Sequence, residues 1–205
     1  MGAPSLSGLA VDLAATSARA GLGLVLGVVA GVALGLTAAA MARRTSVAEG
    51  ALDFARSIPP VLFLPPLLLV FGWNDVARVG TTAAGCTWLM ALSVTSAATA
   101  RRSVRVEVLR IAGATLWQQL AWTQPWEGLA VLAVGLRASA SMALVVTVVT
   151  EMIAGAEHGI GSRVMSAQIA SDTTELAADL LIVGGLGYLV NLALRRLESW
   201  AKRYA

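Results

Sequence analysis

The run AGLGLVLGVVAGVALGLTAAAM, residues 20–41, decides the class of fold. It contains no charged side chain, and it is long enough for a transmembrane helix, which needs about 20 mostly apolar residues. Four of its five glycines recur every fourth position, at Gly23, Gly27, Gly31 and Gly35, and therefore share one helix face. Small residues on one face let a second helix come close within a membrane. We expect this face to pack against another helix.

The composition of the whole chain also indicates a membrane protein. Of its 205 residues, 57% are hydrophobic and only 13% are charged, whereas a soluble domain carries about 25% charged residues. The mean hydropathy is +0.75. So few charges exclude a soluble globular domain, and the high hydrophobicity excludes a disordered chain. We predict an all-α integral membrane protein that forms a single domain over residues 1–205 in the lipid bilayer.

Five apolar stretches are candidate transmembrane helices. The second is short and contains four prolines, so it can span only with irregular ends or as a broken helix sheltered by its neighbours. The fourth is interrupted by Arg137. The predicted spans are residues 20–41, 58–73, 79–100, 128–150 and 176–194.

The arginines predict the orientation of these spans. Fourteen of the fifteen basic residues are arginines, and most of them lie in short clusters after the first, third and fifth spans. The alternate loops carry only Arg78 and Arg163, among acidic residues. Because basic loops face the cytoplasm, we predict an N-terminus outside and a C-terminus in the cytoplasm. The net charge of +3 is too small to argue for a nucleic-acid partner.

The sequence holds little material for catalysis or metal binding. A single cysteine, Cys86, and a single histidine, His158, cannot supply a disulfide, a redox pair or a histidine-based metal site. No Walker-type nucleotide motif is present. An ATP-driven activity would therefore need its nucleotide site on another chain. We expect no catalytic residue, no cofactor and no metal in this chain.

A long cytoplasmic loop, residues 101–125, follows the third predicted span. Apolar residues at helical spacing predict a helix over residues 103–120, in which Gly113 permits a bend or the close approach of another backbone. Pro125 is expected to start the next helix, because proline suits a first turn. From the residues alone, this loop helix could bind a soluble partner or lie at the membrane surface without one.

Several ordered motifs resemble permease subunits of bacterial binding-protein-dependent ABC importers. EVLRIAGA at residues 107–114, followed by GLR at residues 135–137, resembles the EAA loop of those subunits. TEM at residues 150–152 and GIG at residues 159–161 are similar to a pattern of the nitrate, sulfonate and taurine branch. The resemblance extends from about residue 17 to the C-terminus.

The chain also departs from that family pattern. The two alanines of the loop motif are replaced by Val108 and Leu109, and Pro125 falls one residue early. Family members usually have a further N-terminal span, and we expect this chain to lack that span. Five spans without that first helix agree with an N-terminus outside.

The resemblance implies a function and a set of partners. The chain would be a permease subunit, not itself an enzyme, in the bacterial inner membrane, and it would form the path for a small anionic or polar solute such as nitrate, a sulfonate or taurine. A homodimer would work with two copies of a separate ATPase subunit, and an extracytoplasmic binding protein would deliver the solute. The loop would be a coupling helix seated in the ATPase. The residues assigned to coupling are Glu107, Arg110, Gly113 and Ala114.

Two other classes of protein stay open at this point. One is a channel or secondary transporter without ATP coupling, although the internal repeats of many secondary transporters are absent here. The other is a membrane scaffold that has lost transport. Within the permease interpretation, the glycine face of residues 20–41 would be either an interface of the transport core or ordinary helix packing.

Two ionisable residues of the fourth predicted span need an explanation. Arg137 lies about 10 residues inside it, where a charge costs at least about 2.5 kcal/mol. We expect it to pair with an acidic neighbour, and the alternative is contact with an anionic solute. Glu151 could pair with Arg163, face the binding protein or be solvated, and we expect a structural or gating role. His158 is expected to be solvated.

Overall fold

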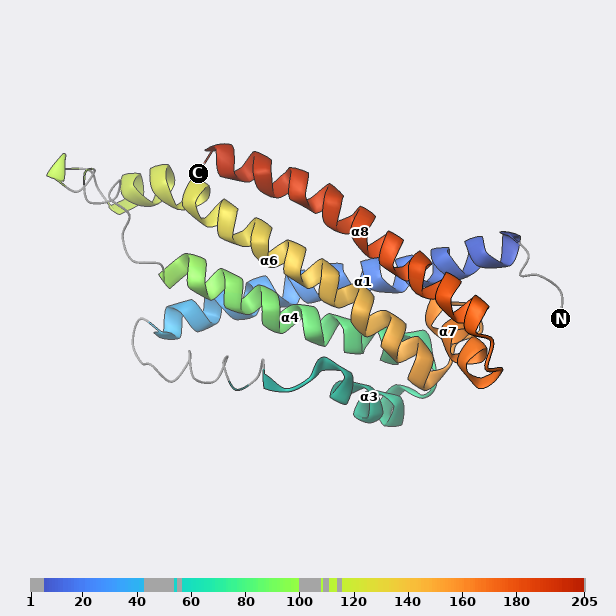
Figure 1. Cartoon of the computed structure of the whole chain (residues 1–205). Coiled ribbons are helices and arrows are strands. Elements are labelled where there is room, and N and C mark those ends of the chain that lie inside the picture. The colour runs from blue at the N-terminus through green and yellow to red at the C-terminus, as the bar shows by residue number, and fades with distance from the viewer. Residues whose placement is uncertain are drawn as a thin grey trace.

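The computed structural model describes residues 6–42, 57–99 and 116–204, together with residues 54, 108 and 111–113. In these residues the secondary structure is helical, with short turns and without a β-strand (Figure 1). This confirms the predicted all-α class. The elements, in chain order, are α1 (Leu6–Ala42), η1 (Pro60–Phe63), α3 (Leu64–Phe71), α4 (Asp75–Thr99), α6 (Leu116–Ala154), α7 (Ile160–Ile169) and α8 (Thr173–Tyr204).

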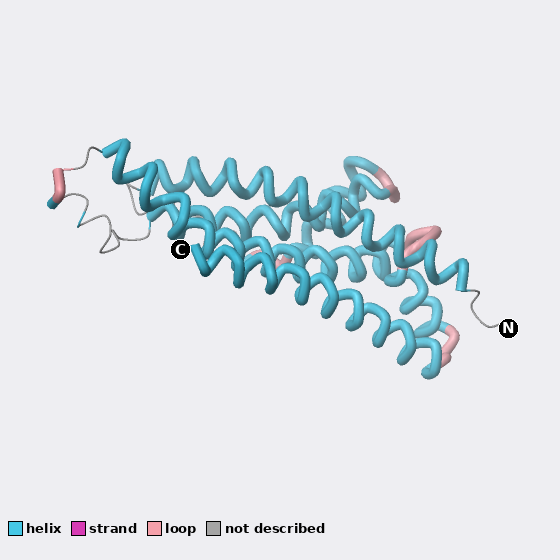
Figure 2. Tube along the Cα trace, turned by 90° about the horizontal axis from the view of Figure 1, so that it is seen from above, coloured by secondary structure: helices cyan, strands magenta, loops and turns pink. Residues whose placement is uncertain are grey.

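Four long helices form the body of the molecule. α4 lies between α1 and α6, and α8 packs against the opposite side of α6 (Figures 1 and 2). The beginnings of α1, α4 and α8, the end of α6 and the short helix α7 meet at one end of the bundle, which we call the α7 end. The C-terminus lies at the opposite end.

Three of the described helices are long and apolar enough to cross a membrane. They are Ser7–Ala39, Val131–Ala154 and Thr173–Arg196, and they contain or overlap the first, fourth and fifth predicted spans. α4 largely coincides with the third predicted span and has 25 residues, but its threonines make it less apolar than α1. The total of five spans stays a prediction.

The proline-rich segment forms the broken helix that its sequence allows. η1 is a 3-10 helix, and α3 continues from it for eight residues until Gly72, at φ 81°, ends the helix. Pro60–Phe71 spans about 18 Å at the usual rise of 1.5 Å per residue, which is shorter than the hydrocarbon core of about 30 Å. Prolines lack the backbone N–H that a continuous helix requires, and this explains the irregular geometry.

Two predicted helix boundaries are wrong. α1 begins at Leu6, well before the predicted start at residue 20, because polar residues of its first turns are satisfied by neighbouring elements. α6 begins at Leu116 and contains Pro125, which was expected to start the helix. A proline in a helix interior costs about 3 kcal/mol, and the good helix formers on both sides carry the helix through it.

The glycine face of α1 lies directly against α4. A Cβ atom on Gly31 would lie 2.7 Å from the carbonyl oxygen of Thr87 and from Cβ of Met90. Gly23, Gly27 and Gly35 make equally close approaches to the same helix. The two backbones therefore touch along four turns, and this contact fixes α1 relative to α4.

Candidate functional site

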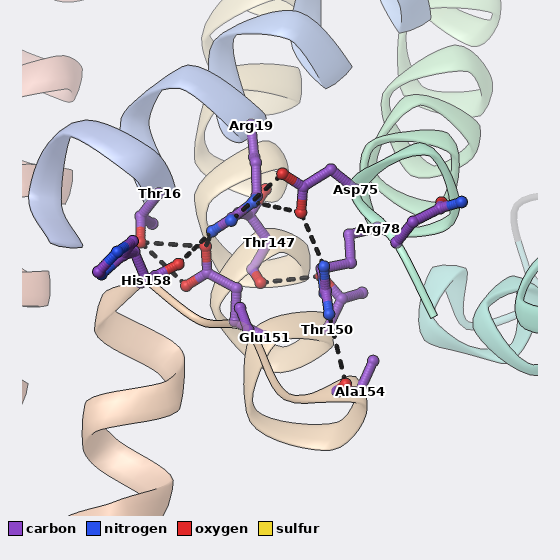
Figure 3. A network of polar contacts seen from close by, with 12 residues as sticks. Thr16, Arg19, Asp75, Arg78, Thr147, Thr150, Glu151, Ala154 and His158 are labelled. Atoms are coloured by element: carbon purple, nitrogen blue, oxygen red, sulfur yellow. Dashed lines mark hydrogen bonds and ion pairs between the residues drawn. The ribbon is translucent and has the colours of Figure 1, made fainter. Parts of the chain in front are cut away.

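Charged and polar side chains gather at the α7 end, and Figure 3 shows those of α1, α4 and α6 that face one another there. The gathered side chains come from the first turns of α1, α4 and α8, from the last turns of α6, and from α7 with the loop before it. Burying a charge is costly unless it is paired and hydrogen-bonded. The hydrogen bonds at this end therefore show how the structure tolerates these groups.

Glu151, near the end of α6, is the most deeply buried of these charges, with no exposed surface. Arg19 Nη1 donates to its Oε1 at 2.7 Å, and Thr16 Oγ1 donates to its Oε2 at 2.9 Å. The backbone N–H of Gly161 donates to Oε2 at 3.0 Å. Thr16 Oγ1 also accepts a hydrogen bond from the N–H of Ile160 at 2.9 Å. The carboxylate is thus held by α1 and by the start of α7.

The two glycines of the GIG motif make room for this carboxylate. A Cβ atom on Gly159 would lie 2.6 Å from the carboxyl carbon of Glu151. A Cβ atom on Gly161 would lie 2.7 Å from Cβ of Glu151. Gly159 also has φ 153°, a value that side chains disfavour. The glutamate of TEM and the glycines of GIG therefore form one structural unit.

Arg19 joins this unit to α4. Its Nη1 also donates to the carbonyl oxygen of His158 at 2.6 Å. Its Nε and Nη2 donate to the two carboxylate oxygens of Asp75 at 2.8 and 3.3 Å. This bidentate contact fixes the orientation of the planar guanidinium relative to the carboxylate.

Asp75 and Arg78 complete a closed network of hydrogen bonds that links α1, α4 and α6. Arg78 Nη1 donates to Asp75 Oδ1 at 2.7 Å, and Nη2 donates to the carbonyl oxygens of Ala154, at 3.4 Å, and Gly155 at the end of α6. Partial burial of Asp75 works to raise its pKa, but the hydrogen bonds from Arg19 and Arg78 outweigh it and lower the pKa below its usual value. We call the closed circuit of Glu151, Arg19, Asp75 and Arg78 the polar clamp of α1, α4 and α6.

Arg163 on α7 forms a second group of ion pairs. Its Nε lies 3.2 Å from Asp179 Oδ1, and its Nη2 lies 3.2 Å from Glu175 Oε1, both on α8. Its Nη1 lies 3.7 Å from Asp12 Oδ2 on α1. Asp12 Oδ1 in turn accepts the backbone N–H of Gly159 at 3.0 Å.

These contacts correct one prediction and leave another as expected. Glu151 is buried, so the solvated alternative is wrong, and its ion-pair partner is Arg19 and not Arg163. The reason is the early start of α1, which brings Arg19 into the bundle. Asp12, Thr16 and Arg19 are spaced four and three residues apart, so they share one helix face. This spacing is the sequence signal that indicates the earlier start of α1. The side chain of His158 is 55% exposed, which fits the expected solvation.

Among the partners of Arg137 is an amide, and its expected pairing with an acidic neighbour stays a prediction. Its Nε donates to Oδ1 of Asn191 on α8, which is an amide oxygen and not a carboxylate. The arginine is half-buried between α6 and α8. This hydrogen bond ties the two helices together far from the α7 end.

The structure describes only part of the predicted coupling loop. Glu107, Arg110 and Ala114 lie outside the described residues. Gly113 adopts φ 78°, a conformation that favours glycine, and the N–H of Ala112 donates to the carbonyl of Val108 at 2.9 Å in the turn before it. A Cβ atom on Gly113 would meet nothing within 4 Å. The described residues also include no group of three histidine, cysteine or acidic residues that could hold a metal ion.

Comparison with known proteins gives a consistent result. Residues 23–203 match the family described as binding-protein-dependent transport system inner membrane component. The putative aliphatic sulfonates transport permease protein SsuC of Bacillus subtilis (strain 168) is 26% identical over 190 residues, which cover 91% of this chain and 68% of SsuC. The taurine transport system permease protein TauC of Escherichia coli (strain K12) is 24% identical over 186 residues, which cover 91% of this chain and 67% of TauC.

Solved structures share the same fold. The MetNI methionine ABC transporter, in an inward-facing conformation, contains a chain that matches with a TM-score of 0.79 at 20% identity, covering 98% of this chain and 99% of that chain. A chain of an amino acid ABC transporter crystallised with histidines matches with a TM-score of 0.67, also at 20% identity, over the full length of both chains.

Proposed function

Because the chain belongs to the family of binding-protein-dependent transport system inner membrane components, we propose that it is the permease subunit of an ATP-driven importer for a small anionic or polar solute. The family match over residues 23–203 is the observation that carries this proposal. The chain is a multi-pass inner-membrane transport protein of the sulfonate and taurine type. The finer assignments below concern its solute, its partners and its orientation.

The solute we propose is a sulfonate or a similar small anion. Two of the similar relatives are named for aliphatic sulfonates and for taurine, which is itself a sulfonate. In this chain Arg137 supplies a positive charge between α6 and α8. Its hydrogen bond to Asn191 favours a structural role, and an anion passing along this face would meet the same guanidinium.

The ATPase partner is proposed to bind at the end opposite the α7 end. The motif over residues 107–114 falls in the sequence between the end of α4 and the start of α6, and a Cβ atom on Gly113 would meet no described atom within 4 Å. Arg195 and Arg196, near the end of α8, are exposed there. Because basic segments face the cytoplasm, this end would lie inside the cell with the C-terminus. Two ATPase subunits would bind there, while the binding protein would dock at the α7 end.

We also propose that two copies of the chain form the permease. The exposed face of α8 carries Gly184 and Gly185, which meet nothing within 4 Å at their Cβ positions, and Tyr188, which is largely exposed. Small residues and a hydroxyl group suit contact with another protein helix better than contact with lipid. The aliphatic side chains of Leu181 and Leu189 are also exposed on α8, and a second copy would cover them.

Co-purification with an ATPase tests the proposal. The tagged chain would be isolated from its native membrane, and the complex would be reconstituted with the binding protein and taurine or an alkyl sulfonate. We expect an ATPase subunit to co-purify and its ATP hydrolysis to rise with the loaded binding protein. Gly113→Trp should fold but lose the ATPase, and Gly72→Trp, at a similar φ of 81° and also with nothing within 4 Å of its Cβ position among the described residues, is the matched control. A chain that purifies without an ATPase and conducts the solute without ATP would overturn the proposal.

A further inference from the structure

The helices at the α7 end are held in two different ways. The polar clamp joins α1, α4 and α6 in a closed circuit, so that each of these helices bonds to the other two. Thr82 on α4 and Thr147 on α6 add a hydrogen bond of 3.0 Å one turn deeper. Breaking one contact leaves these helices connected by the others. We therefore treat their ends as one body.

α8 is attached to this body much more weakly. Only 6% of its most apolar segment is buried, against 33% for α1 and 39% for the span within α6. Midway along it, a Cβ atom on Gly184 or Gly185 would meet no described atom within 4 Å. Among the described residues, polar contacts tie it at the α7 end through Arg163 and further along at Asn191. Asn191 follows Asp179 by twelve residues, or about 18 Å along the helix.

Asp179 makes the contact at the α7 end costly to lose. Its side chain is 1% exposed, and Arg163 Nε bonds its Oδ1. Its Oδ2 has no hydrogen-bond partner among the described residues. A buried carboxylate that loses its cation is strongly destabilised. The Asp179 carboxylate is therefore stable in this position only while Arg163 faces it.

Arg163 also contacts the other body. Its Nη1 points to Asp12 on α1, and Asp12 accepts the N–H of Gly159, whose neighbour Ile160 bonds to Thr16. One guanidinium thus connects α8 with the helices of the polar clamp. Without this connection, α8 would keep its hydrogen bond at Asn191 and the short turn to α7, and its first turns would lose their ion pairs to α7.

We propose that Arg163 is a positioning residue that latches α8 to the clamped helices, and that this latch opens when α8 moves during the transport cycle. The latch itself follows from the ion pairs and from the loose packing of α8. Its part in transport rests on the proposed function. Release and re-formation of the three ion pairs would give α8 two discrete positions, as a switching element requires.

Distances between spin labels test the latch in the full chain, with Cys86→Ser and in nanodiscs. One pair of labels, at Val76 on α4 and Ala178 on α8, reports on the latch. A second pair, at Val76 and Ile153 on α6, reports on the clamp. Arg163→Gln should broaden and lengthen the first distance and leave the second unchanged. Arg196→Gln, the same change at an exposed site on α8, should alter neither.

A second variant guards against misfolding of Arg163→Gln. Asp179→Asn combined with Glu175→Gln removes the same ion pairs from α8 without leaving a buried unpaired carboxylate. It should broaden the distance between Val76 and Ala178 in the same way. An unchanged distance in this variant would overturn the latch, and so would equal broadening of the control distance between Val76 and Ile153.

ATP hydrolysis by the assembled importer tests the role in transport. Freed from its latch, α8 should reach the alternative position without the binding protein. Arg163→Gln should therefore raise binding-protein-independent hydrolysis several-fold above that of the unsubstituted chain. A longer label distance with unchanged hydrolysis would show a purely structural contact and would overturn this part. Failure of the proposed function would instead show in the unsubstituted chain, as a lack of ATPase assembly.

Discussion

Replacing Arg19 by methionine tests whether the buried Glu151 depends on a single cation. Methionine keeps the unbranched length of the side chain but removes the charge and the donors. The variant would lose the 2.7 Å ion pair to a carboxylate that has no exposed surface. Asp75 would lose the same partner, but its side chain is 57% exposed, so water can replace most of that contact. The effect therefore falls mainly on Glu151.

The expected magnitude follows from that burial. Removing one partner of a buried ion pair costs about 3–5 kcal/mol, a large part of a typical stability of about 5–15 kcal/mol. For a chain of this length the midpoint of thermal unfolding should fall by roughly 10 °C. Thermal unfolding in detergent, followed by tryptophan fluorescence, measures this shift. Arg196→Met, at an exposed site, is the matched control.

A double variant separates the charge from the space that the side chain fills. Arg19→Met combined with Glu151→Gln leaves a neutral amide that Thr16 and Gly161 can still contact through its oxygen. It should recover part of the lost stability. The reasoning is refuted if Arg19→Met is as stable as Arg196→Met, since Glu151 would then not need a cation.

Three further predictions concern other parts of the molecule. Gly31→Leu should separate α1 from α4 and lower the yield of folded protein, because a Cβ atom would lie 2.7 Å from a carbonyl oxygen on α4. Gly21→Leu, whose Cβ position meets no described atom within 4 Å, should not lower the yield. Equal yields of the two variants would contradict the packing of α1 against α4. Arg137→Leu should cost about 1.5–3 kcal/mol through its hydrogen bond to Asn191, seen as a lower unfolding temperature with or without solute, and a stable variant defective only in transport would favour contact with the solute instead. The lowered pKa of Asp75 stabilises the fold fully above the usual pKa of the carboxyl, and this stability is lost as the pH falls through the lower pKa of the folded state. In Asp75→Asn the unfolding temperature should therefore depend less on pH between about pH 5 and pH 2 than in the unsubstituted chain.

The sequence predicted the class of fold well because apolar runs are a local signal. Long charge-free runs require helices in a membrane, whatever their neighbours are. The early start of α1 was missed because hydropathy excludes Asp12, Thr16 and Arg19 from an apolar run. These residues are acceptable there only because other helices supply their partners. A boundary that depends on such partners is not visible in the local pattern.

The partners within the site were equally hard to predict. The burial of Glu151 requires a cation, but the chain offers several arginines at this end, and the nearest in sequence, Arg163, is not the one used. The choice depends on how α1 packs against α6. The motif residues were easier to identify, since the TEM and GIG patterns stand together in the chain. Their geometric relation, with Gly159 and Gly161 making room for the glutamate, came only from the structure.

The polar clamp also has a consequence for biosynthesis. Arg19 and Glu151 are separated by 132 residues, so a ribosome adding about 5–20 residues per second makes the glutamate about 7–26 s after the arginine. The glycine face of α1 finds α4 sooner, because Gly31 precedes Met90 by fewer residues. The newly inserted α1–α4 pair therefore exists before the clamp can close. During that interval Asp75, which follows Arg19 by 56 residues, is the carboxylate available to pair with the guanidinium.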